Sequence, residues 1–104
     1  MSERNRPDDS EVPLDIAERL KRCRRRIDEL DEAIVELLNT RATCADEIGS
    51  LKGVVGMETY QPRRERDVLE QVLAANSGPL APEAIRRIFE CIIDESRRLE
   101  TSHE

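Results

Sequence analysis

The chain has 104 residues, a net charge of −6 and two aromatic side chains, Tyr60 and Phe89. This length fits one domain, and a composition rich in Leu, Ile, Glu and Arg favours long helices over a β-sandwich or barrel. The negative charge argues against non-specific binding of nucleic acid and gives no reason to expect attraction to an anionic membrane.

No apolar run approaches the ~20 residues of a membrane span, and the N-terminus lacks a signal-peptide pattern. The chain has three cysteines, Cys23, Cys44 and Cys91, and each lies at a helical position expected to face the core. The odd number and these positions predict small buried apolar side chains in a reducing cytosol rather than disulfides or metal ligands. The single histidine, His103, lies in a polar tail. We expect a cytoplasmic protein that holds no metal.

Residues 1–12 are polar and show no periodicity, so we expect a disordered N-terminal arm, followed by a helical domain over residues 13–101. A 3.5- to 3.6-residue period then runs from about Leu14 to Leu51. A helix of that length measures ~57 Å, which exceeds the width of a globule of this size. It must therefore pack on partners along its length, most simply a second copy of the chain.

One position interrupts the apolar seam of this helix. Every seventh residue from Leu20 is apolar except Arg41. A buried guanidinium is costly unless carboxylates or an anionic ligand meet it, although a polar seam residue can also fix register or oligomeric state. Lys52 follows on nearly the same face and is one of two lysines beside fifteen arginines, which favours a need for a compact ammonium.

Residues 53–61 are expected to form a loop, followed by a second helix over about 61–75 and a third over about 82–100. Arg64 and Glu65 begin the second helix, and Ser96 and Glu100 continue the inward face of the third. With Arg41 and Lys52 they supply three cations, two carboxylates and a hydroxyl. This set suits binding of a small anion with several carboxylates and does not suit nucleophilic catalysis. Taken singly, each residue also fits a solvated helix face.

The pattern as a whole resembles the all-α chorismate mutase family over about residues 14–100. The residues that carry the resemblance are Arg24, Ile27, Leu30-Asp31, Leu37-Leu38, Arg41, Gly49, Lys52, Arg64-Glu65-Arg66-Asp67, Phe89, Ile92-Ile93, Glu95 and Ser96. The resemblance implies an intertwined homodimer of three-helix protomers with two active sites. Each site would convert chorismate to prephenate by a [3,3] rearrangement, with no metal or organic cofactor.

The resemblance also implies roles for single residues. Arg41, together with Arg24 from the other subunit, would bind the two substrate carboxylates, and Lys52 would donate to the ether oxygen and a carboxylate. Arg64 would orient the site, Glu65 would accept from the ring hydroxyl, and Ser96 would assist at a carboxylate. Geometry supports the exchange between subunits, since Arg24 and Lys52 lie ~42 Å apart along one helix. Antiparallel pairing about a point near Ile34 would bring Arg24 of one chain beside residues 41–52 of the other.

Two residues depart from the best-known pattern of the family. Glu100 stands where Gln is usual, and it must carry a proton to donate to the ether oxygen; burial favours that proton and Lys52 opposes it. We therefore expect activity to fall as pH rises. Gln61 replaces an Asp that helps to bind the ring hydroxyl.

Because of Gln61, two alternative activities are retained: isochorismate pyruvate lyase and mutase of an amino-substituted chorismate. A non-catalytic helical dimer that senses a metabolite or regulates a pathway enzyme is a further alternative. An enzyme of the shikimate pathway is a candidate partner, either as an activator of the mutase or as a target that this chain regulates.

Overall fold

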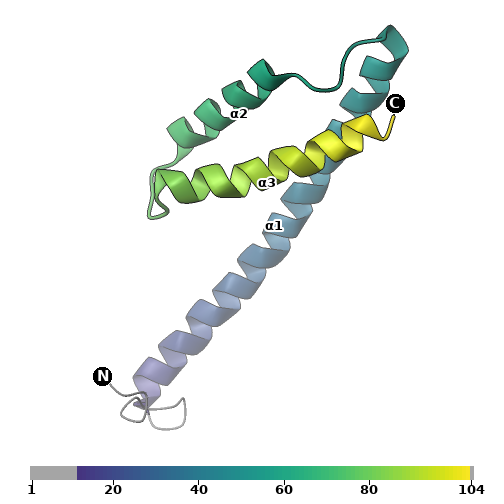
Figure 1. Cartoon of the computed structure of the whole chain (residues 1–104). Helices are drawn as coiled ribbons and strands as arrows, with labels where there is room; N and C mark the ends of the chain where they lie inside the picture. Colours follow the sequence, from purple (N-terminus) through teal and green to yellow (C-terminus); the bar gives the residue numbers. More distant parts are fainter. Residues whose placement is uncertain (1–11, 104) are drawn as a thin grey trace, which may run out of the picture. The chain divides into compact units, whose positions relative to one another are not determined.

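The computed structural model describes residues 12–103 and contains three helices in that range. They are α1 (Leu14–Val55), α2 (Pro62–Ala75) and α3 (Pro82–Thr101) (Figure 1). The expectation of an all-α chain with a long first helix and two shorter ones is confirmed. The predicted disordered arm lies, except for Val12, outside the described residues.

Helix α1 ends four residues later than the sequence pattern predicts. Gly53 does not break the helix, and Gly56, with φ of +69°, ends it. The amide of Met57 donates to the carbonyl of Lys52 at 2.8 Å and the amide of Gly56 donates to that of Gly53 at 3.4 Å. These two bonds form a Schellman cap, in which a glycine adopts the left-handed conformation that other residues avoid. The predicted loop over 53–61 is therefore wrong for residues 53–55.

The chain divides into two compact units, residues 1–37 and 38–104. The described part of the first unit is the N-terminal portion of α1, whose apolar seam stays exposed in the single chain. Ile27 and Leu37 are 54% and 69% exposed, and Leu30 and Ile34 are also exposed. A seam of this regularity is typical of a helix that packs against another helix.

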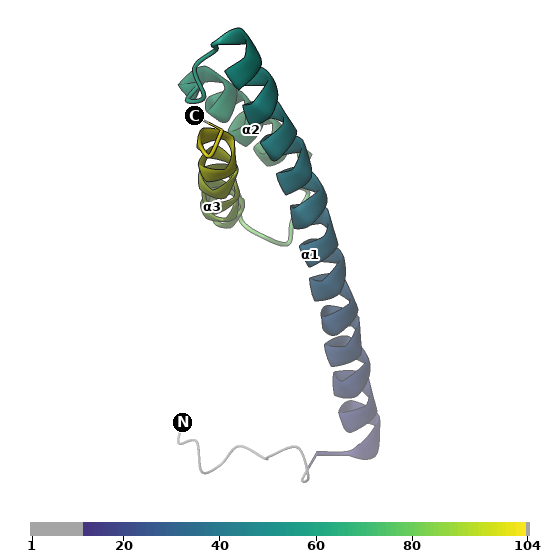
Figure 2. The ribbon, with the colours of Figure 1, turned by 90° about the vertical axis from the view of Figure 1, so that its right-hand side faces the viewer.

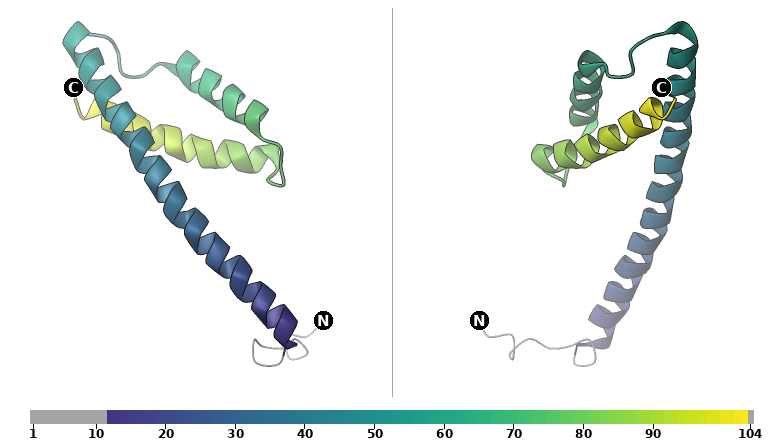
Figure 3. Two further views of the ribbon diagram at one scale, coloured as in Figure 1. Left: turned by 180° about the vertical axis from the view of Figure 1, so that it is seen from behind. Right: turned by 45° about the vertical axis from the view of Figure 1, so that its right-hand side comes forward.

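The second unit contains the C-terminal portion of α1 together with α2 and α3. Helices α2 and α3 lie side by side, and the C-terminal end of α3 reaches the C-terminal portion of α1 (Figures 2 and 3). Ala45 of α1 and Ile93 of α3 are the buried apolar side chains among the described residues. Both side chains line a pocket together with polar side chains of the same two helices.

The three cysteines are free thiols and are exposed in the single chain, so the prediction that they occupy core positions is wrong for one protomer. Cys23 and Cys44 follow the period of α1, but the described part of the chain leaves both of them uncovered. Over residues 12–103, no helix is both long enough and apolar enough to cross a membrane.

Candidate active site

A pocket of about 340 Å³ opens in the second unit, between the C-terminal portion of α1, the start of α2 and the C-terminal half of α3. Small-molecule sites usually have volumes of about 300–1,000 Å³. The pocket brings together seven of the eight predicted site residues: Arg41, Lys52, Gln61, Arg64, Glu65, Ser96 and Glu100. The eighth, Arg24, belongs to the first unit and does not line this pocket.

Arg41 is held at the pocket by a neutral partner. Its Nη1 donates to Oγ of Ser96, and Ser96 in turn donates to the carbonyl of Ile92 at 3.0 Å. A hydroxyl can donate one hydrogen bond while accepting another. The contact with Ser96 therefore orients the guanidinium without neutralising its charge, which leaves Arg41 suited to an anionic ligand.

Lys52 and Glu100 form an ion pair inside the pocket. Nζ of Lys52 lies 3.1 Å from Oε1 of Glu100 and donates to the carbonyl of Thr59 at 3.2 Å. The two charged side chains are 14% and 16% exposed. An ammonium has three N–H donors, so these two contacts leave one donor for a ligand.

Gly49 allows this pair to form. A Cβ atom at position 49 would lie 2.6 Å from Cα of Glu100 and 2.8 Å from its carbonyl oxygen. Only a residue without a side chain permits this approach between α1 and α3. Since Gly49 precedes Lys52 by one helical turn, the close approach places Glu100 beside the ammonium.

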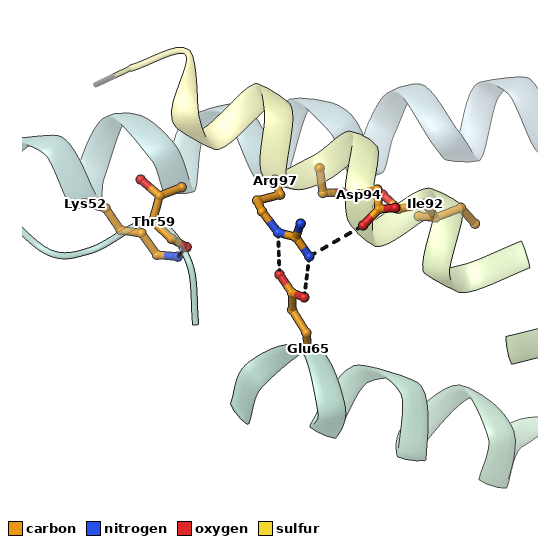
Figure 4. A network of polar contacts seen from close by, with 7 residues as sticks. Lys52, Thr59, Glu65, Ile92, Asp94 and Arg97 are labelled. Atoms are coloured by element: carbon orange, nitrogen blue, oxygen red, sulfur yellow. Dashed lines mark hydrogen bonds and ion pairs between the residues drawn. The ribbon is translucent and has the colours of Figure 1, made fainter. Parts of the chain in front are cut away.

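Glu65 enters the pocket from the first turn of α2. Its two oxygens accept from Arg97, with Nε to Oε2 at 2.9 Å and Nη2 to Oε1 at 2.7 Å (Figure 4). Hydrogen bonding to Glu65 raises the pKa of Arg97 above its ordinary value, so the arginine stays charged. Asp94 and the ring of Tyr60 also contact this guanidinium.

Sequence reasoning missed some features of the site. Thr59, which is buried, supplies the carbonyl that anchors Lys52, and nothing in the loop sequence marks it. Arg97 beside Arg98 resembles an exposed basic helix end, so its pairing with Glu65 carries no sequence signal. Ile48, Val68 and Ile93 form the apolar wall of the pocket.

The arrangement offers hydrogen-bond donors for a small anion beside an apolar wall. Arg41 and Lys52 supply charged donors from α1, and Arg64 supplies a further cation at the start of α2. Charge-assisted hydrogen bonds of this kind are about twice as strong as neutral ones. No group of His, Cys, Asp and Glu able to hold a metal occurs among the residues that the structure describes.

Fold and pocket thus define an all-α domain with a cation-lined pocket. The family described as "Chorismate mutase type II" matches residues 23–101. A chorismate mutase structure (Form II) from Thermus thermophilus is 35% identical, with a TM-score of 0.78 over 80% of this chain and 94% of that one. The chain belongs to the type II chorismate mutase family.

Curated relatives include longer proteins. A bifunctional chorismate mutase/prephenate dehydratase from Stutzerimonas stutzeri is 38% identical over 89 residues, which cover 81% of this chain and 24% of that protein. A chorismate mutase from Methanocaldococcus jannaschii is 25% identical over 87 residues, covering 83% of this chain and 88% of that protein. The chain therefore spans about a quarter of the bifunctional relative and most of the shorter one.

Proposed function

We propose that this chain converts chorismate to prephenate. The observation that carries the proposal is the convergence of Arg41, Lys52 and Arg64 with Ser96 in one pocket of the second unit. Chorismate carries two carboxylates, an ether oxygen and a ring hydroxyl, and the pocket offers a group of suitable chemistry for each of them except the second carboxylate. Family membership supports the same reaction.

The rearrangement is intramolecular and needs no covalent bond to the protein. The protein must hold the compact, chair-like conformer and stabilise negative charge that develops on the ether oxygen as the C–O bond breaks. In this proposal Arg41 binds one carboxylate, with Ser96 beside it. The remaining donor of Lys52 serves the ether oxygen, Arg64 orients the substrate, and Glu65 accepts from the ring hydroxyl.

Glu100 is the second group at the ether oxygen. As a carboxylate it would repel the developing charge, whereas as a carboxylic acid it donates a hydrogen bond. In the ligand-free structure Glu100 pairs with Lys52, so both groups that would face the ether oxygen lie side by side in the pocket. The proposal therefore requires Glu100 to act as a hydrogen-bond donor, a role that an amide at the same position could also fill.

The second carboxylate requires a cation that this pocket receives from another copy of the chain. The exposed seam of α1 around Ile34 is the surface on which a second copy would pack. Antiparallel packing about a two-fold axis would deliver Arg24 from each copy to the pocket of the other. The protein is then a homodimer with two composite sites.

The test is to incubate the purified protein with chorismate and to follow loss of chorismate and formation of prephenate. Isochorismate and an amino-substituted chorismate are offered in parallel, because Gln61 lines the pocket where the family pattern has an Asp at the ring hydroxyl. Prephenate formation supports the proposal. Turnover of isochorismate to pyruvate alone, or binding of chorismate without turnover, would contradict it.

A further inference from the structure

Arg97 lies behind the pocket and holds one of its acidic groups. Glu65 lines the pocket, whereas Arg97 is not among the lining residues. We infer that Arg97 is a positioning residue, which fixes the carboxylate of Glu65 for recognition of the ring hydroxyl of the substrate. This inference rests on the proposed function and goes beyond it, because Arg97 itself would not touch the substrate.

The contact has the geometry that fixes a carboxylate in both position and rotation. Two parallel hydrogen bonds, at 2.9 and 2.7 Å, join the planar guanidinium of Arg97 to both oxygens of Glu65. A bidentate pair of this kind restricts rotation more than a single contact does. Each oxygen retains a second lone pair, so Glu65 can still accept a hydrogen bond from a ligand.

The guanidinium is itself held from other directions, as Figure 4 shows in part. Nη2 of Arg97 lies 3.5 Å from Oδ1 of Asp94, one turn earlier on α3. The ring of Tyr60 lies 5.0 Å from the guanidinium carbon, within the range of a cation–π contact. Arg97 thereby links α3 to the first turn of α2 and to the segment that leads into it.

The charge distribution of the pocket shows why this positioning matters. Glu65 and Glu100 are the carboxylates among the described lining residues, and Glu100 is paired with Lys52. Glu65 is therefore the acidic acceptor left for a hydroxyl, since the neighbouring Gln61 is neutral. Because both of its oxygens accept from Arg97, Glu65 has less tendency to pair with a cation of the pocket and to compete with the carboxylates of the substrate.

Arg97→Met tests this role, because methionine keeps part of the length and removes the charge. Arg98→Met is the matched control, since Arg98 is 78% exposed and its ion pair joins it to Glu95 on its own helix. We expect Arg97→Met to raise KM for chorismate about tenfold, the effect of losing roughly one hydrogen bond between Glu65 and the ring hydroxyl. The value of kcat should change much less, because the hydroxyl contact exists before and during the reaction. Arg97→Lys should recover part of the loss.

A double-mutant cycle separates positioning from general stability. In a Glu65→Gln background, Arg97→Met should change kcat/KM by less than about twofold, because the group through which Arg97 acts is gone. A similar loss in both backgrounds, or an Arg97→Met enzyme that matches Arg98→Met, would overturn the inference while chorismate turnover stands. A wild-type protein with no turnover of chorismate would contradict the proposed function and the inference together. Thermal unfolding of each variant verifies that it is folded.

Discussion

Replacement of Gly49 by alanine should separate the ends of α1 and α3 at the proposed reaction centre. The new Cβ would lie 2.6 Å from Cα of Glu100, whereas carbon atoms in contact lie about 3.5–4.0 Å apart. The backbone of α3 at Glu100 must therefore retreat by about 1 Å. A retreat of that size would take the 3.1 Å contact between Lys52 and Glu100 out of hydrogen-bond range.

The expected loss of activity follows from that displacement. A misplacement of about 1 Å in a catalytic group can cost about 100-fold in rate, so we expect kcat/KM to fall by about that factor. The stability change should be small by comparison, because an overpacking cost of about 1–3 kcal/mol is offset by about 1 kcal/mol of improved helix propensity.

Gly53→Ala is the matched control, one turn further along α1. Its Cβ would lie 3.7 Å from the carbonyl oxygen of His103, an ordinary contact. The gain in helix propensity should make this variant equally active and slightly more stable. Steady-state kinetics and thermal unfolding of both variants provide the test. A Gly49→Ala enzyme as active as Gly53→Ala would refute the argument that close helix approach places Glu100.

Three further predictions concern charge, hydrogen bonding and assembly. Arg41→Ala should lower kcat/KM at least about 100-fold, because it removes hydrogen bonds to a carboxylate worth about 1.5–3 kcal/mol each; circular dichroism should show an intact fold. Glu100→Gln should keep or raise kcat, since an amide N–H can donate to the ether oxygen, and a large loss of kcat in this variant would contradict the role of Glu100 as a donor. Ile34→Glu should dissociate the homodimer in sedimentation experiments and abolish turnover, whereas an active monomer would contradict the composite site.

The sequence predicts the helices because their periodicity is long and their breaks are marked by proline and glycine. The predicted end of α1 is wrong for a physical reason. Gly53 costs a helix only about 1 kcal/mol, so it is tolerated, while Gly56 supplies the left-handed conformation of the cap. The sequence alone does not show which of two glycines three residues apart ends the helix. The hydrogen bonds around them show that it is Gly56.

The candidate site is largely predictable because its residues interrupt apolar stripes. Six of the eight predicted residues stand out on that basis, and the family resemblance adds Arg24 and Gln61. Arg97 could not be predicted, since its partner lies on another helix 32 positions away and both residues sit in ordinary charged runs. The burial of Thr59 likewise depends on the conformation of the loop, which no local sequence pattern predicts.

The most direct test of the account is complementation between two inactive subunits. Arg24→Ala and Arg41→Ala chains with different tags would be produced together, and the mixed dimer purified through both tags. In an antiparallel two-fold dimer, one of the two sites then receives Arg41 from one chain and Arg24 from the other. The account predicts that each variant alone is inactive with chorismate and that the mixed dimer has about half the wild-type activity. A mixed dimer as inactive as its parents would contradict a site shared between two copies of this chain.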